Sequence, residues 1–174
     1  MPIHLLMMDD ELISVFPDQA AFEARYQCSC ADVYDHMAEV LRQTRALHQA
    51  VPRAPEWGGY FAVETKLNTV VGTCAFVAAP DADGQVEIAY FTLPPYEGRG
   101  YGTAMAAALR DLAQADPRVR TLIAHTLPEP NASTRILTAI GMQRAGDAID
   151  PDAGPVWRWA YALPDRPGAA GGEG

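Results

Sequence analysis

The alternation of apolar and polar residues divides the second half of the chain into strands and helices with short connections. Five runs rich in β-branched and aromatic residues predict strands: 60–64, 69–77, 86–93, 119–126 and 156–163. Apolar residues recur at helical spacing after residue 101, and a second helical run spans 133–140, just before Gly141. This order predicts antiparallel strands, then strand, helix, strand and helix, and finally a closing pair of strands.

The first third of the chain predicts mainly helices. Residues 3–8 form a short apolar run that predicts a strand, and 18–26 predicts a short helix. The segment 32–49 has the clearer helical pattern, because its apolar positions from Val33 to Leu47 fall on one face. Asp32 is suited to cap this helix at its N-terminus.

Residues 96–104, YEGRGYGTA, join the strand 86–93 to the helix that follows. Three glycines alternate there, at Gly98, Gly100 and Gly102. Glycine permits positive φ angles and leaves no side chain between the backbone and a ligand. A strand that turns through such a loop into a helix directs free N–H groups and the positive end of the helix dipole at one point. The segment therefore predicts a binding site for a phosphate-bearing ligand.

Three phosphate motifs can be compared with this loop. A P-loop needs Lys followed by Ser or Thr after its last glycine, whereas Gly102 is followed by Thr103 and Ala104. The dinucleotide fingerprint G-x-G-x-x-G, counted from Gly98, fails at Thr103. The flanking strand and helices favour the third motif, a loop for the pyrophosphate of coenzyme A.

At these residues the chain resembles the GCN5-related N-acetyltransferase (GNAT) superfamily. The family's pyrophosphate motif, Gln/Arg-x-x-Gly-x-Gly/Ala, corresponds to EGRGYG at 97–102, with Glu97 in place of Gln or Arg. The segment 128–142 resembles the second cofactor-contacting motif, and VEIAY at 86–90 resembles the branch of the ribosomal-protein alanine acetyltransferases. The resemblance covers roughly residues 57–163.

The resemblance implies the acyl-CoA N-acyltransferase fold, an α+β protein with three layers, α/β/α. Its mixed, mostly antiparallel sheet contains a parallel pair of central strands that splay apart, and the pantetheine arm of coenzyme A lies in the gap. The residues implied to contact the cofactor are Phe91, Thr92, Leu93, Glu97, Gly98, Arg99, Gly100, Tyr101, Gly102, Thr103, Asn131 and Ser133. Among these, the backbone of 91–93 is expected to pair with the pantetheine arm and to polarise the thioester carbonyl.

Acetyl transfer to an amine also needs a group that accepts the amine's proton. Glu87 is the first candidate, because it shares a strand face with Ala89 and Phe91. His125, near the end of the next strand, is the second candidate. Asn131 has two open interpretations: it replaces the family's catalytic-site Asn one position late, or it only caps a helix.

The proton donor for the leaving thiolate has several candidates. Leu137 stands where many family members carry a Tyr, and its side chain cannot donate a proton. Tyr90, Tyr101, Ser133 or solvent could supply the proton in its place.

Composition narrows the class of protein. The chain has 174 residues, 49% of them hydrophobic and 20% charged, and a net charge of −9, which argues against nucleic acid as the main partner. No apolar run approaches the roughly 20 residues that span a bilayer, and no basic region opens a signal peptide. Three cysteines form no zinc or disulfide pattern, so reduced core thiols and no metal are expected. Together these features favour a cytoplasmic enzyme without a membrane partner.

We expect one GNAT-like domain over 1–163, with a variable helical part over 1–56, a cofactor-binding core over 57–163 and a flexible tail over 164–174. The leading hypothesis is an N-acetyltransferase that uses acetyl-CoA and acts on a primary amine, either a small molecule or a protein N-terminus. The alternatives are a non-catalytic acyl-CoA sensor or interaction module on the same fold, and an enzyme that transfers a different acyl group. A homodimer is a further expectation, because dimers are common in this superfamily.

Overall fold

A computed structural model describes residues 2–30, 33–51 and 53–164, so the predicted cap at Asp32 and the segment 165–174 lie outside the described residues. The elements in chain order are β1 (Ile3–Met7), α1 (Asp10–Val15), α2 (Gln19–Tyr26), α3 (Tyr34–Ala50), η2 (Pro55–Trp57), β2 (Gly59–Glu64), β3 (Thr69–Phe76), β4 (Gln85–Thr92), η3 (Pro94–Tyr96), α4 (Tyr101–Ala115), β5 (Thr121–Thr126), α5 (Ala132–Ala139), β6 (Gln143–Asp150) and β7 (Gly154–Ala162).

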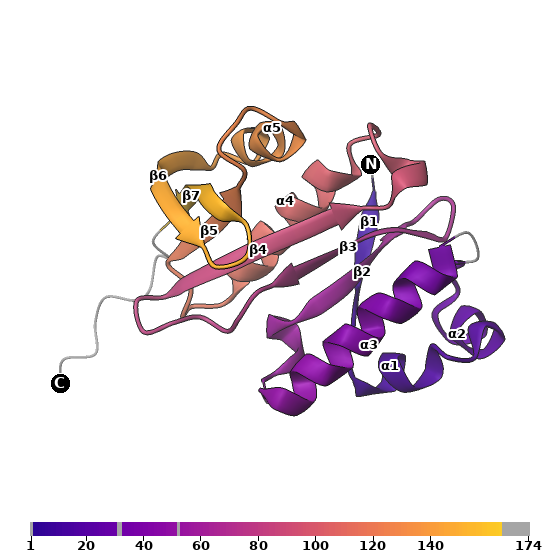
Figure 1. The fold of residues 1–174 in the computed structure, drawn as a ribbon. Helices are drawn as coiled ribbons and strands as arrows, with labels where there is room; N and C mark the ends of the chain where they lie inside the picture. The colour runs from indigo at the N-terminus through magenta and orange to yellow at the C-terminus, as the bar shows by residue number, and fades with distance from the viewer. Residues whose placement is uncertain (1, 31–32, 52, 165–174) are drawn as a thin grey trace.

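The strands form one seven-stranded sheet in the order β1-β2-β3-β4-β5-β7-β6 (Figure 1). All neighbours are antiparallel except β4 and β5, which are parallel. The parallel pairing joins Gln85–Glu87 to Thr121–Ile123, although β4 continues to Thr92 and β5 to Thr126. The two central strands therefore diverge after Glu87 and Ile123, which confirms the predicted mixed sheet with a splayed parallel pair.

Helices cover both faces of the sheet (Figure 1). The N-terminal helices α1, α2 and α3 lie on one side, where Met37 and Leu41 of α3 are buried. On the other side α4 packs on β3 and β4 through Met105 and Leu109, and α5 lies beside α4 and packs on β5. This confirms the three-layer arrangement. Because β1 pairs with β2, the segment before residue 57 contributes to the same sheet as the predicted core.

Several details of the helices differ from the sequence pattern. The short helix α1 was not predicted; Asp9 caps it by accepting a hydrogen bond from the Leu12 N–H at 2.9 Å. Leu47 and Leu112 were expected on buried faces, but 53% and 42% of their surfaces are exposed. Within the ranges that the structure describes, no helix is both long and apolar enough to cross a membrane.

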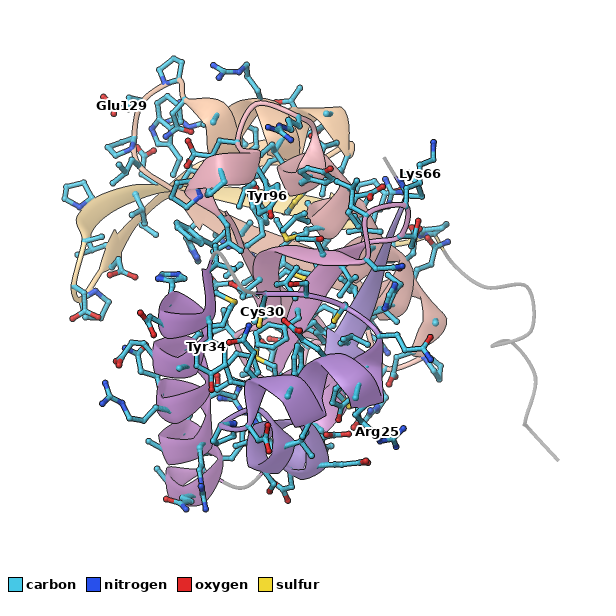
Figure 2. All side chains as sticks on the ribbon, turned by 90° about the vertical axis from the view of Figure 1, so that its right-hand side faces the viewer. Arg25, Cys30, Tyr34, Lys66, Tyr96 and Glu129 are labelled. Atoms are coloured by element: carbon cyan, nitrogen blue, oxygen red, sulfur yellow. The ribbon has the colours of Figure 1, made fainter. Side chains whose placement is uncertain are left out.

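The three cysteines are free and buried, as expected for reduced core thiols. Figure 2 shows Cys30 in the interior, whereas Arg25 and Lys66 lie at the surface. Burial raises the pKa of Cys28 and Cys30 to about 11 and that of Cys74 to about 12. These thiols are therefore protonated at neutral pH and behave as packing groups.

Replacing Gly72 of β3 with Ala should destabilise the fold. A Cβ at this position would lie 2.5 Å from the backbone oxygen of Phe91 in β4, so the two strands would have to move apart. We expect a loss of about 1–3 kcal/mol in the free energy of unfolding, measured by urea denaturation. Gly59→Ala is the control, because its Cβ would meet only the flexible Met8 side chain. Equal losses for both variants would contradict this account of β3–β4 packing.

Candidate functional site

A hollow of about 750 Å³ opens between the end of β4, the loop 97–100, the start of α4 and helix α5, and we call it the α4–α5 hollow. The residues predicted from sequence that line it are Phe91, Thr92, Glu97, Gly98, Gly100, Tyr101, Gly102, Thr103 and Ser133. Further lining residues are Tyr90, Ala132, Arg135, Ile136 and Ala139. The lining does not include Leu93, Arg99 or Asn131.

The three glycines of the loop serve two different purposes. Gly98 and Gly100 have φ angles of +72° and +84°, and added Cβ atoms would meet nothing within 4 Å. At these two positions glycine is favoured by backbone conformation. Gly102 is the opposite case, because its Cβ would lie 2.6 Å from Cδ1 of Ile136 on α5. Gly102 therefore allows α4 and α5 to approach each other closely.

The N-terminus of α4 points its free backbone donors into the hollow. Gly100 is the N-cap and has no side chain to satisfy them. The Ala104 N–H donates to the Gly100 carbonyl at 3.1 Å, so the N–H groups of Tyr101, Gly102 and Thr103 precede this first intrahelical bond. Because all three residues line the hollow, their N–H groups and the helix dipole favour an anion there.

Charged side chains surround this N-terminus without filling it. Glu97 is exposed and lines the hollow, so its carboxylate can remain in solvent while backbone groups contact an anion. Arg99 is also exposed, and its guanidinium lies 5.9 Å from the centre of the Tyr96 ring, outside the lining. Arg135 of α5 is exposed and lines the hollow directly. The described residues contain no group of three or more His, Cys, Asp or Glu side chains that could hold a metal ion.

The backbone of β4 separates the three residues predicted to pair with a ligand. The Leu93 N–H donates to Val71 in β3 at 3.0 Å, and the Glu87 carbonyl accepts from Val77 at 2.9 Å. Because backbone groups alternate along an antiparallel strand, those of Phe91 also face β3. The backbone groups of Tyr90 and Thr92 face the side of β5, beyond its last paired residue. The backbone groups of Thr92 thus point toward the gap, whereas those of Phe91 and Leu93 are paired with β3.

Tyr90 contacts α5 across this gap, although sequence reasoning placed it only among the proton-donor candidates. Its hydroxyl donates to the Ser133 carbonyl at 3.3 Å. Burial raises the pKa of Tyr90 to about 12, and the hydrogen bond to Ser133 lowers it in part. Tyr101, another of those candidates, is 1% exposed and packs edge-on against Tyr96. Tyr90 is therefore the tyrosine whose hydroxyl lies between β4 and α5.

Glu87 and His125, the two candidate bases, are hydrogen-bonded to each other. The distance from His125 Nδ1 to Glu87 Oε1 is 2.7 Å, and 27% and 30% of the two side chains are exposed. Glu87 belongs to the last paired residues of β4, and His125 lies two residues beyond Ile123, where β5 diverges. The pair thus bridges the two strands at the start of the splay. No sequence pattern indicated that these side chains would meet.

Asn131 caps α5. Its Oδ1 accepts from the Thr134 N–H at 3.0 Å, while its own N–H donates to Thr134 Oγ1 at 2.9 Å. This reciprocal capping box agrees with the structural interpretation of Asn131 and occupies its side-chain oxygen. A catalytic role for Asn131 stays a prediction.

The family model described as acetyltransferase (GNAT) domain matches residues 8–143 of this chain. Sequence comparison with curated proteins found no match. The fold, in contrast, is found in many solved structures.

Three of those structures illustrate the similarity. An acetyltransferase of the GNAT family from Bacillus anthracis has a TM-score of 0.64 and 15% identity, covering 94% of this chain and 96% of the other. The ribosomal-protein-S5-alanine acetyltransferase from Vibrio fischeri has a TM-score of 0.61 and 15% identity, covering 95% and 94%. AAC(6')-Ib in complex with ribostamycin and coenzyme A has a TM-score of 0.65 and 18% identity, covering 93% and 94%. At these identities the likeness concerns the fold.

The raised pKa of Tyr90 can be tested by titrating tyrosinate absorbance in the wild type and in Tyr90→Phe. The difference between them should appear near pH 12 and not near the ordinary value of 10. Since the folded pKa is raised, the stability contributed by neutral Tyr90 is complete below pH 10 and is lost as pH rises toward 12. At neutral pH the variant should lose about 0.5–1.5 kcal/mol with the bond to Ser133. A difference near pH 10 would contradict the burial of this hydroxyl.

Proposed function

Because the chain belongs to the GNAT acetyltransferase family, we propose that it transfers an acetyl group from acetyl-CoA to a primary amine. One observation carries the proposal: the donor-rich N-terminus of α4 and the end of β4, beyond its last pairing with β5, line the same hollow. A ligand held there would have one end at an anion site and the other beside free backbone groups of a strand. Coenzyme A has this character, with a pyrophosphate at one end and an amide-containing arm that leads to the sulfur.

The residues of the α4–α5 hollow suit this cofactor in three ways. Gly98 and Gly100 leave open space beside the backbone, and the N–H groups at the start of α4 offer hydrogen bonds to the pyrophosphate. Arg135 supplies a cation at the rim. The backbone of Thr92, aimed at the gap, can pair with the arm and donate to the thioester oxygen. Phe91 and Leu93, assigned to this pairing from sequence, would contribute through packing.

Bound acetyl-CoA supplies an activated acyl group, and the chain's part is to place the amine and accept its proton. The side chains of Glu87, Ala89 and Phe91 face α3, on the side of the sheet opposite α5. A hollow of about 580 Å³ on this side is lined by Asp35, His36 and Phe91 among others. The amine would approach from here and meet the Glu87–His125 pair at the splay.

Two acceptor classes fit this face. The net charge of −9 favours cationic substrates, which include small polyamines or aminoglycosides and peptide N-termini. Solved relatives of the fold include a spermidine N-acetyltransferase from Vibrio cholerae in complex with coenzyme A and spermine, and the alanine acetyltransferase noted above. An amine panel with both classes, read out as free coenzyme A thiol, distinguishes them. Coenzyme A binding with no turnover on any amine would favour the sensor alternative.

Thr103→Glu tests the anion site. The new carboxylate would lie in the first turn of α4, where it favours the helix by about 0.3–1 kcal/mol, so the protein should be at least as stable as the wild type. Coenzyme A should bind at least about tenfold more weakly, because two like charges about 4 Å apart near a surface repel by about 4 kcal/mol. Calorimetric titration with coenzyme A measures the affinity, and urea denaturation measures the stability.

Thr103→Gln is the matched control, because it has the same size without the charge. It should retain affinity close to that of the wild type. If Thr103→Glu bound coenzyme A as tightly as Thr103→Gln, the pyrophosphate would not lie at α4 and the proposal would fail.

A further inference from the structure

The hydrogen bond between Glu87 and His125 indicates a different role for each of the two side chains. An ionised carboxylate can only accept hydrogen bonds, so the 2.7 Å contact places the imidazole proton on Nδ1. In neutral His125 the other nitrogen, Nε2, then carries the free lone pair. Glu87 Oε1 accepts this bond, while its second oxygen, Oε2, keeps its lone pairs. The imidazole adds a second basic atom, Nε2, on the opposite side of the ring from the carboxylate, and the hydrogen bond holds the ring in place.

The position of the pair at the splay supports a role in chemistry. Backbone pairing of β4 with β5 ends at Glu87 and Ile123, so His125 lies two residues past the last pair, where the strands begin to diverge. The partial exposure of His125 leaves its ring accessible. The two side chains lie at the start of the gap, where an amine and a thioester could meet.

We propose that His125 accepts the proton of the attacking amine through Nε2, and that Glu87 is a positioning residue that fixes its tautomer and orientation. This assignment rests on the proposed function and reverses the order expected from sequence, where Glu87 was the first choice as base. It also explains why the base is contributed by β5 and its partner by β4: the pair can form only where the strands are still close.

The proposed step balances in atoms and charge. A neutral amine forms a C–N bond with the acyl carbon as the C–S bond breaks, and the coenzyme A thiolate leaves. The nitrogen gives one proton to Nε2 of His125, and the imidazolium that results stays paired with Glu87 through Nδ1. The imidazolium then releases its proton to solvent, and the thiolate takes one up. The products are the amide and the free thiol.

Other charged groups lie around His125. Asp150, at the end of β6, is close enough to interact with it: hydrogen bonds from the Ala153 and Asp152 N–H groups hold the pKa of Asp150 below its ordinary value, and His125 adds to this effect. Arg158 of β7 is the strand neighbour of His125, but its guanidinium donates to Gln85 Oε1 at 2.8 Å. Together with Glu87 these groups present two carboxylates and one cation to the imidazole.

The substitution His125→Asn tests proton acceptance by Nε2 separately from the hydrogen bond to Glu87. The Asn amide can still donate to Glu87 from the position of Nδ1, but it has no equivalent of Nε2. We expect kcat to fall about 10²–10³-fold, with the KM for acetyl-CoA and the Kd for coenzyme A unchanged. The profile of kcat/KM against pH should lose the limb that belongs to the imidazole. His4→Asn, the same substitution on the exposed edge strand β1, should leave all these quantities unchanged.

The opposite results for the two variants would overturn the proposal. If His125→Asn kept the wild-type kcat and pH profile while Glu87→Gln abolished turnover, Glu87 would be the base and the proposal would be overturned. Failure of the wild type to release thiol with any amine in the panel, despite binding coenzyme A, would instead refute the proposed function.

A measurement without turnover tests the tautomer by itself. Long-range proton–nitrogen NMR spectra of the four histidines, with His125→Asn identifying the signal, should show neutral His125 in the Nδ1–H form. In Glu87→Gln the amide can either accept from Nδ1–H or donate to Nδ1, so the signal should no longer show the Nδ1–H form exclusively. An Nε2–H form in the wild type would overturn the proposed assignment even if no acceptor had been found.

Discussion

The parallel pairing of β4 with β5 stops after three residues on each strand, and the rest of the site depends on this limit. If the pairing continued, the backbone groups of Tyr90 and Thr92 would form hydrogen bonds with β5. Those of Phe91 and Leu93 already face β3. The divergence leaves polar backbone groups of two half-buried residues without a strand neighbour, and a ligand or water can satisfy them. This edge of β4 is therefore suited to pair with a ligand in place of a neighbouring strand.

Packing against α5 maintains the divergence. Helix α5 sits beside α4 because Gly102 leaves room for Ile136, and Tyr90 is tied to the first turn of α5 through Ser133. The capping box of Asn131 and Thr134 fixes where that helix begins. A chain of local contacts thus runs from the glycine loop to the far side of the gap.

Much of this arrangement was readable in the sequence because it depends on local rules. The glycine loop and the end of α5 before Gly141 each follow from backbone conformation at single residues. The contact between Glu87 and His125 could not be read in the same way, because it joins residues 38 positions apart and depends on strand register. Which backbone groups face the gap also depends on register, so the sequence could name 91–93 but could not separate Thr92 from its neighbours.

The contact between Gly102 and Ile136 has an evolutionary consequence. A Cβ at position 102 would lie 2.6 Å from Cδ1 of Ile136, so a residue larger than Gly there requires the Ile136 side chain to shift or to be shorter while α4 and α5 keep their distance. In homologues aligned to this chain, Ala at position 102 should be accompanied by Val, Ala or another shorter residue at position 136. Gly98 and Gly100, which face open space at positive φ, should remain glycine independently of any partner residue. Covariation of position 102 with position 136, without covariation at positions 98 and 100, would reflect the different structural roles of the three glycines.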